Sequence, residues 1–410
     1  DYSQVNFAAD ADIYVELVTP AYVVLEQVLA QGLSKDLLTD TVVFNALMDA
    51  LVIGLETSLA EALAPAVVRA VVAKLEGNSN EIISSAAKAL DIENVSDETI
   101  MNDLYTVAEA ARIANELGII NTLVNKAELQ LTDAEGYAEL VAKVFEMNMV
   151  DAAFADVLVA FVEAVANVDL STTNLSNMDV EAEQATIVEL VRNGVLLANS
   201  LGVETLKGVK PFAKDYLSAV KAAVADAKDL AKSKEYLEAV KVAFNAVVDP
   251  IREADTAVIK ETLELVAELQ LVEEAGLEIY KQAIYSKLDG VLAVIGDVHD
   301  YTNEQFAEDL SVFVEIADIL YDSKIYTVIT ERTLPGEECI PQLEEAVKLA
   351  CELNIVEVKK ADLEKVINKL FEGRLEIADV DYSKVNFAAD ADIYAELVTP
   401  AYVVLEQLLA

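Results

Sequence analysis

The sequence predicts an all-α fold in which tandem helical hairpins form an α-solenoid or an elongated multi-helix bundle. Three observations favour this class: apolar residues recur with helical period, capping signals flank those runs, and the sequence repeats itself. In residues 104–117 the apolar positions follow three- and four-residue steps; they are Leu104, Val107, Ala108, Ala111, Ala114 and Leu117. Strand-like alternation does not extend over any comparable length.

Start and stop signals divide the chain into about a dozen or more helices of roughly ten to twenty residues. Capping boxes are expected where Ser or Thr precedes Glu or Gln by three residues, at Ser58–Glu61, Thr132–Glu135 and Thr302–Gln305. Glycine follows several periodic runs, at Gly32, Gly118, Gly202 and Gly276. There it supplies the left-handed residue that ends a helix.

The strongest repetition links the two ends of the chain. Residues 1–30 recur at residues 381–410, an offset of 381 − 1 = 380, and only three pairs differ: Gln4/Lys384, Val15/Ala395 and Val28/Leu408. Shared helical composition does not produce such identity. We therefore expect residues 1–380 to form one complete repeat unit, divisible into two subdomains at about 1–178 and 179–380. Residues 381–410 are then the start of the next copy.

A weaker repetition lies inside this unit. An offset of 206 sets residues 137–165 beside 343–371 and matches seven pairs, namely Glu139/Glu345, Val141/Val347, Glu146/Glu352, Asn148/Asn354, Val150/Val356, Ala155/Ala361 and Asp156/Asp362. A chain rich in Ala, Val and Glu also produces such a score by chance. The sequence alone therefore leaves open whether a helical hairpin was duplicated.

Composition excludes several classes of partner. Lys and Arg number 29 against 73 Asp and Glu, a net charge of −44, while 54% of residues are hydrophobic. The apolar content is enough for a folded core, unlike that of a disordered acidic tail. The acidity argues against nucleic-acid binding and against anionic lipid surfaces. Acidic residues interrupt every apolar run before the roughly 18 residues of a membrane span, so we expect no membrane insertion.

Few residues are candidates for specific chemistry. Asp297, His299 and Asp300 form a weak metal-site candidate, but a zinc site normally needs three or four converging ligands, and a solvent-facing histidine is the simpler interpretation. The calcium-loop pattern is missing, since Asp10-Ala-Asp12 is followed by Ile13. We expect no cofactor and no catalysis, with at most diffuse divalent-cation binding, such as calcium, on the acidic surface.

The two cysteines, Cys339 and Cys351, lie twelve positions apart. Two interpretations remain open: a disulfide from a turn onto the following helix, in an oxidising compartment, or two independent thiols with Cys351 in the core. Three tyrosines, Tyr2, Tyr14 and Tyr22, recur in the second copy. They are interpreted as packing residues at helix rims, with an interaction surface as the alternative.

These features predict a structural or spacer module of a long tandem-repeat protein, extracellular or on a cell surface, serving as a stalk, adhesin or filament segment. Its partners would be neighbouring copies of the repeat, and other proteins in addition. The alternative is a helical-repeat scaffold that binds a protein partner. A weaker alternative is an enzyme built on a helical toroid and using acidic residues; the absence of tryptophan and of nucleophile or nucleotide motifs disfavours it.

Overall fold

A computed structural model describes residues 5–32, 34–79, 81–151, 180–230, 236–268, 277–278, 281, 301–360 and 384–409. The all-α prediction is confirmed, because the described residues form helices and no strand, apart from an isolated bridge between Gln130 and Thr205. Contacts divide the chain into two compact units. Unit 1 comprises residues 1–195 and 204–207, and unit 2 comprises residues 196–203 and 208–410.

The first half of the chain contains α1 (Ala11–Glu16), α2 (Val18–Gln31), α3 (Thr41–Leu55), α4 (Ser58–Glu76), α5 (Glu81–Ala89), α6 (Asp97–Glu116), α7 (Ile119–Asn125), α8 (Ala134–Phe145), α9 (Asn148–Asp151) and α11 (Val180–Ser200). The second half contains α12 (Leu206–Leu230), α13 (Tyr236–Val248), α14 (Thr256–Glu268), α16 (Asn303–Asp322), α17 (Thr327–Thr330), α18 (Ile340–Glu352), α19 (Asn354–Lys359), α21 (Ala391–Ala395) and α22 (Val398–Leu409). Short 3₁₀ turns lie at Lys35–Thr39, Ile92–Asn94, Asp249–Ile251 and Glu337–Cys339.

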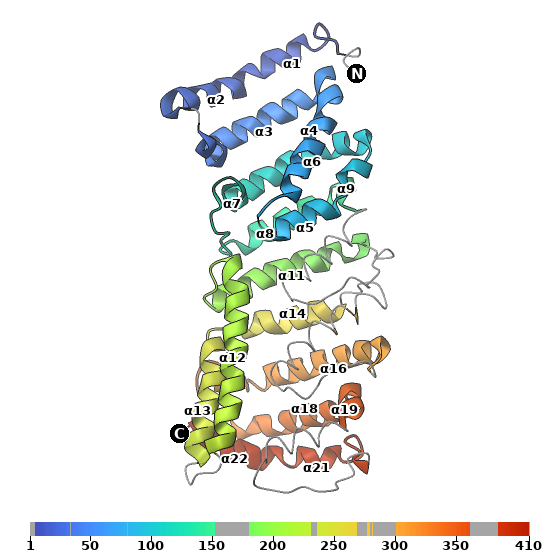
Figure 1. Cartoon of the computed structure of the whole chain (residues 1–410). Coiled ribbons are helices and arrows are strands. Elements are labelled where there is room, and N and C mark those ends of the chain that lie inside the picture. The colour runs from blue at the N-terminus through green and yellow to red at the C-terminus, as the bar shows by residue number, and fades with distance from the viewer. Residues whose placement is uncertain are drawn as a thin grey trace. The chain divides into compact units, whose positions relative to one another are not determined.

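In unit 1 each main helix packs on the next one: α2 on α3, α3 on α6, and α6 on α8 (Figure 1). The helices α4 and α5 pack against each other, and α4 also contacts α6. Apolar side chains from α3, α4, α5, α6, α8, α9 and the 3₁₀ turn Ile92–Asn94 form one buried cluster, which includes Leu55, Val72, Ile92, Ile100, Leu104, Phe145 and Met149.

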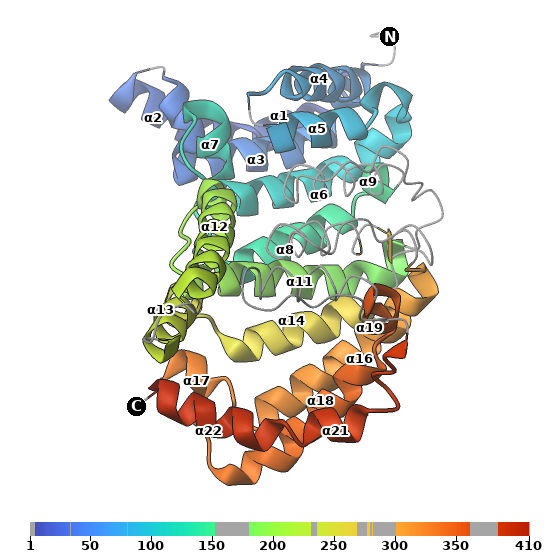
Figure 2. The ribbon, with the colours of Figure 1, turned by 60° about the horizontal axis from the view of Figure 1, so that its bottom comes forward.

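Unit 2 also packs its main helices in succession. The helix α14 packs on α16, α16 packs on α18, and α18 packs on α21 and α22 (Figure 2). Its buried cluster centres on Tyr301, Phe306 and Leu310. The rings of Tyr301 and Phe306 meet edge to face with their centroids 6.0 Å apart, a geometry that aromatic pairs favour.

The helices α6 and α16 occupy matching positions in the two units. Both helices have 20 residues. They begin at Asp97 and Asn303, so their starts are related by the offset 303 − 97 = 206 that the sequence showed more weakly elsewhere. Two buried apolar residues near the start of each helix also correspond at this offset: Ile100 with Phe306, and Leu104 with Leu310. The spacing that the sequence left open therefore recurs in the arrangement of buried residues.

The predicted stop signals agree with the structure wherever it describes them. Gly32, Gly118 and Gly202 have positive φ values between 70° and 81° and end their helices, whereas Gly276 lies outside the described residues. Of the predicted capping boxes, the one from Thr302 to Gln305 is present with both reciprocal hydrogen bonds.

The other two predicted boxes are wrong, because the N-cap is the neighbouring residue and the third residue after it is Ala60 or Gly136 in place of a glutamate. The N-caps are Thr57 in place of Ser58, and Asp133 in place of Thr132. The Ser58 hydroxyl instead donates to Asp10 Oδ2 at 2.7 Å. A tertiary hydrogen bond has thus replaced the local cap that the sequence pattern predicted.

Candidate functional site

The residues predicted to be candidates for metal binding, Asp297, His299 and Asp300, lie outside the described residues. Within the part of the chain that is described, no cluster of three or more His, Cys, Asp or Glu side chains could hold a metal ion.

The two cysteines are free thiols in this structure. Cys339 is buried at the N-cap of α18, and Cys351 lies partly buried near the other end of the same helix. Twelve helical residues rise about 18 Å, whereas a disulfide requires Cα atoms within about 7 Å. The disulfide allowed by the sequence is therefore incompatible with an intact α18, because the turn before this helix does not fold back along it. Burial and the neighbouring Glu338 raise the pKa of the Cys339 thiol.

Two buried carboxylates hold equivalent positions in the two units. Asp103 on α6 and Asp309 on α16 are each 1% exposed, and their numbers differ by the same offset, 309 − 103 = 206. The Asp103 carboxylate accepts hydrogen bonds from Asn148 Nδ2 at 2.8 Å and Met149 N at 2.7 Å. These donors lie at the start of α9, so the carboxylate satisfies amides that a helix start leaves without partners.

Asp309 does the same for α19. Its Oδ1 accepts from Asn354 N at 2.7 Å and its Oδ2 from Ile355 N at 2.9 Å. A further hydrogen bond, from the Tyr301 hydroxyl, reaches Oδ2 at 2.5 Å. Each carboxylate thus accepts charge-assisted hydrogen bonds from its own chain, and it anchors the start of a short helix, α9 or α19.

Neither aspartate was predicted from the sequence as a functional residue. The aligned windows began at residues 137 and 343, so they included Asn148 and Asn354 but not the aspartates that contact them. Extending the same offset to Asp103 and Asp309 would have found the acceptors as well as the donors.

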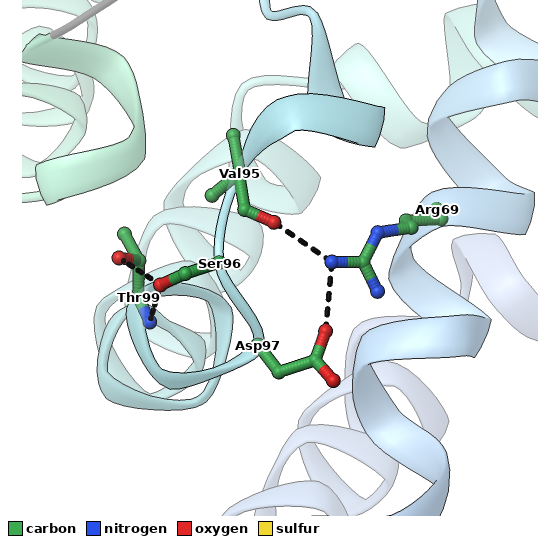
Figure 3. Close-up of polar contacts among 5 residues, drawn as sticks. All are labelled: Arg69, Val95, Ser96, Asp97 and Thr99. Atoms are coloured by element: carbon green, nitrogen blue, oxygen red, sulfur yellow. Dashed lines mark hydrogen bonds and ion pairs between the residues drawn. The ribbon is translucent and has the colours of Figure 1, made fainter.

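A basic side chain donates a hydrogen bond to the backbone carbonyl just before α6 and just before α16. Arg69 on α4 donates from Nη2 to the Val95 carbonyl and pairs with Asp97 Oδ1, both at 2.7 Å (Figure 3). The same view shows Ser96 capping α6 through Thr99. In unit 2, Lys281 Nζ donates to the Tyr301 carbonyl at 2.9 Å. Val95 and Tyr301 are equivalent at the offset of 206, although their cationic partners are not.

A second pair of cationic contacts follows the same spacing. Lys35 Nζ donates to the Val124 carbonyl at 3.3 Å, and Arg252 Nε donates to the Thr330 carbonyl at 3.0 Å. The two acceptors keep the offset, 330 − 124 = 206, and belong to the last turns of α7 and α17. Cations near helix C-termini satisfy free carbonyls and oppose the helix dipole.

A solvent-open hollow in unit 2 lies beside α19. Its lining includes Glu352, Glu357, Lys360 and Lys384. The Lys360 ammonium donates to Glu357 and to the Val385 carbonyl. These two charged groups are thus engaged with each other and with backbone, as in a surface ion-pair network.

An exposed apolar surface on unit 1 belongs to the first copy of the repeated segment. The helical stretch Ala11–Gln31 is long and apolar enough to cross a membrane by length and composition; an 18-residue window of it has a mean hydropathy of 1.4, and only 6% of that window is buried. Glu16 and Glu26 interrupt this stretch, as the sequence predicts, but they leave its mean hydropathy high. One such helix is weak evidence for a membrane span, since core helices of soluble proteins meet the same criteria.

Comparison with other proteins gives no relative to reason from: no family model matches the chain, and no curated protein or solved structure matches it.

Proposed function

We propose that the chain is a structural module of a tandem-repeat protein, in which successive copies build an extended, acidic spacer at a cell surface or outside the cell. The proposal depends on one observation above the others, the recurrence of residues 1–30 at 381–410. The described parts of the two copies, residues 5–29 and 385–409, also share their helices. No catalytic step is part of this proposal.

The two copies share their helices and the turn before them. Asn6 Oδ1 accepts from Ala9 N at 3.1 Å, and Asn386 Oδ1 accepts from Ala389 N at 3.0 Å. The ring pairs Phe7–Tyr14 and Phe387–Tyr394 both have an interplanar angle of 32°. This agreement supports a repeated structural element, because the segment keeps its conformation in two different surroundings.

The order of packing supports a solenoid-like arrangement within each unit. In unit 1 α2, α3, α6 and α8 pack in succession, and in unit 2 α14, α16, α18 and α21 do so. The buried aspartates, the carbonyls that accept from basic side chains and the length of α6 and α16 recur at the offset of 206. Repeat proteins grow in one dimension because each module buries its apolar face against its neighbours. The net charge of −44 would keep such a polymer solvated and self-repelling.

Small-angle scattering of a chain lengthened by a second repeat, called the extended chain below, tests the spacer proposal. In this chain Ala410 is followed by a second copy of residues 31–410, so that residues 381–410 begin the second unit. A spacer predicts that the maximum dimension rises by more than half relative to the 410-residue chain. A compact particle, with its radius growing only as a globular protein's would, contradicts the proposal.

A further inference from the structure

The two copies of the repeated helix pair bury opposite faces. In the first copy, five apolar residues spaced by three and four are between 53% and 77% exposed: Val15, Val18, Tyr22, Leu25 and Leu29. At the equivalent positions of the second copy, Ala395, Val398 and Tyr402 are each 9% exposed or less, and Leu405 and Leu409 are partly buried. We name this stripe of five positions, in either copy, the preceding face.

The contacts of the second copy show what covers the preceding face. The helices α21 and α22 pack on α18, and α22 also contacts α13 (Figure 2). Lys348 Nζ on α18 pairs with Asp392 at 2.7 Å, and the Tyr402 hydroxyl donates to the Pro335 carbonyl. An apolar stripe, an ion pair and a hydrogen bond thus join this copy to the end of unit 2.

The opposite face of the helix pair behaves in the reverse way. In the first copy Ile13, Leu17, Val23 and Val24 are partly buried where α1 and α2 pack on α3. Asp10, only 7% exposed, accepts from the Ser58 amide and hydroxyl at the start of α4. In the second copy the equivalents Ile393, Leu397, Val403 and Val404 are between 46% and 62% exposed. We name this stripe the following face.

We propose that the helix pair is a shared joint between consecutive repeats, whose preceding face binds the α18 surface of one unit and whose following face binds α3 of the next. This inference rests on the proposed function and adds the partner: another copy of the same repeat. The α18 surface fits the preceding face because it already holds a nearly identical sequence. Asp12, the equivalent of Asp392, would then meet Lys348 of the preceding unit.

Each copy in the 410-residue chain thus has one half of the joint filled. Large apolar stripes left in water are costly at about 25 cal/mol per Å² of apolar surface, and they mark interaction sites. The two exposed stripes are complementary to surfaces that the chain itself contains, which selects a further repeat as the occupant over an unrelated protein or a lipid.

Hydrogen exchange in the extended chain described above tests the joint. Adding α3 behind residues 381–410 should slow amide exchange across 391–409 by at least about tenfold, because the exposed following face becomes covered. Leu397→Asp should abolish this slowing and have little effect on exchange in the 410-residue chain, where Leu397 is 58% exposed. Thr399→Asp is the matched control, because Thr19 and Thr399 are exposed in both copies.

Several results would overturn the joint: unchanged exchange across 391–409 on extension, or a Leu397→Asp effect of equal size in both chains. Exchange in α16 and α18 reports separately whether unit 2 remains folded. Binding of the 410-residue chain to phosphatidylcholine vesicles, with release by Val18→Asp, would instead assign the preceding face to lipid and likewise overturn the proposal.

The joint and the spacer fail separately. If the lengthened chain is compact but its exchange across 391–409 is slowed, the spacer proposal is contradicted and the joint proposal is supported. If the lengthened chain is an elongated particle but Leu397→Asp does not change its exchange across 391–409, the joint proposal is contradicted and the spacer proposal is supported.

Discussion

At the scale of single residues, Asp103 and Asp309 each connect a long helix to the start of a short one. Each is a buried carboxylate with short hydrogen bonds to donors that lie 45 or 46 residues further along the chain. Hydrogen bonds to charged groups stabilise more than neutral ones, and an unfilled buried donor is costly.

Removing either carboxylate should weaken its own unit. We expect Asp103→Ala to lower the free energy of unfolding by roughly 2 to 4 kcal/mol, because the start of α9 loses its acceptors, and Asp309→Ala to do the same for α19. Urea unfolding monitored by circular dichroism measures both. The exposed Glu116 on α6 provides the control, since Glu116→Ala should change stability by no more than about 0.5 kcal/mol. An equal loss in the control would show that α6 merely tolerates no substitution.

The hydroxyl of Tyr137 makes the stability of unit 1 depend on pH in the alkaline range. It donates to the Gln130 carbonyl at 2.6 Å, and burial, assisted by Asp133, raises the pKa of Tyr137 to about 12. Because the folded state favours the neutral phenol, its contribution is complete below the unfolded pKa of about 10 and is lost as pH rises to about 12.

Comparing the wild type with Tyr137→Phe isolates this effect. Between pH 9 and pH 12 we expect the wild type to lose about 2 kcal/mol more stability than the variant, because phenylalanine cannot ionise. Urea unfolding at a series of pH values is the measurement. Parallel pH profiles for the two proteins would mean that Tyr137 ionises equally easily in the folded and unfolded states.

At the scale of secondary-structure elements, the same backbone is built from different residues in the two units. Gly118 precedes α7 with φ 77°, and Lys324, its equivalent at the offset of 206, adopts φ 56°. The next such pair is Lys126 with Arg332, at φ 56° and 57°. Left-handed residues other than glycine are uncommon, so their recurrence shows that the tertiary arrangement imposes the turn.

Glycine substitutions test this backbone requirement. Gly118→Ala should cost roughly 1 kcal/mol, since a Cβ meets no atom within 4 Å and only the positive φ opposes it. Gly54, inside α3, also has free space for a Cβ but no positive φ, so Gly54→Ala should stabilise by roughly 0.5 to 1 kcal/mol. Thermal unfolding of both variants checks the opposite signs. A stabilising Gly118→Ala would contradict the assigned turn.

At the scale of the whole chain, one helix pair occurs in two surroundings and serves as its own control. Val18 is 63% exposed and its equivalent Val398 is 9% exposed. Burying an unpaired charge is costly, whereas a charge at an exposed position is solvated.

The two substitutions should therefore differ in the 410-residue chain. We expect Val398→Asp to lower the stability of unit 2 by about 3 kcal/mol and Val18→Asp to stay within about 0.5 kcal/mol of wild type. Hydrogen exchange resolved by peptide assigns each loss to its unit, and Val15/Ala395 and Val28/Leu408 distinguish the two copies by mass. Equal losses at both positions would contradict the different burial of the two copies.

The helical class, the positive-φ glycines and the near-identity of residues 1–30 and 381–410 can be read from the sequence, because periodicity, caps and repetition are local patterns. It did not reveal that Asp103 and Asp309 cap short helices or that Cys339 and Cys351 stand at opposite ends of α18. Nor did it reveal that Ser58 binds Asp10 in place of capping its own helix.

Above all, which face of each copy is covered depends on the tertiary structure. The same thirty residues meet α3 at one end and α18 at the other, and burial depends on those neighbours as well as on the segment's own residues.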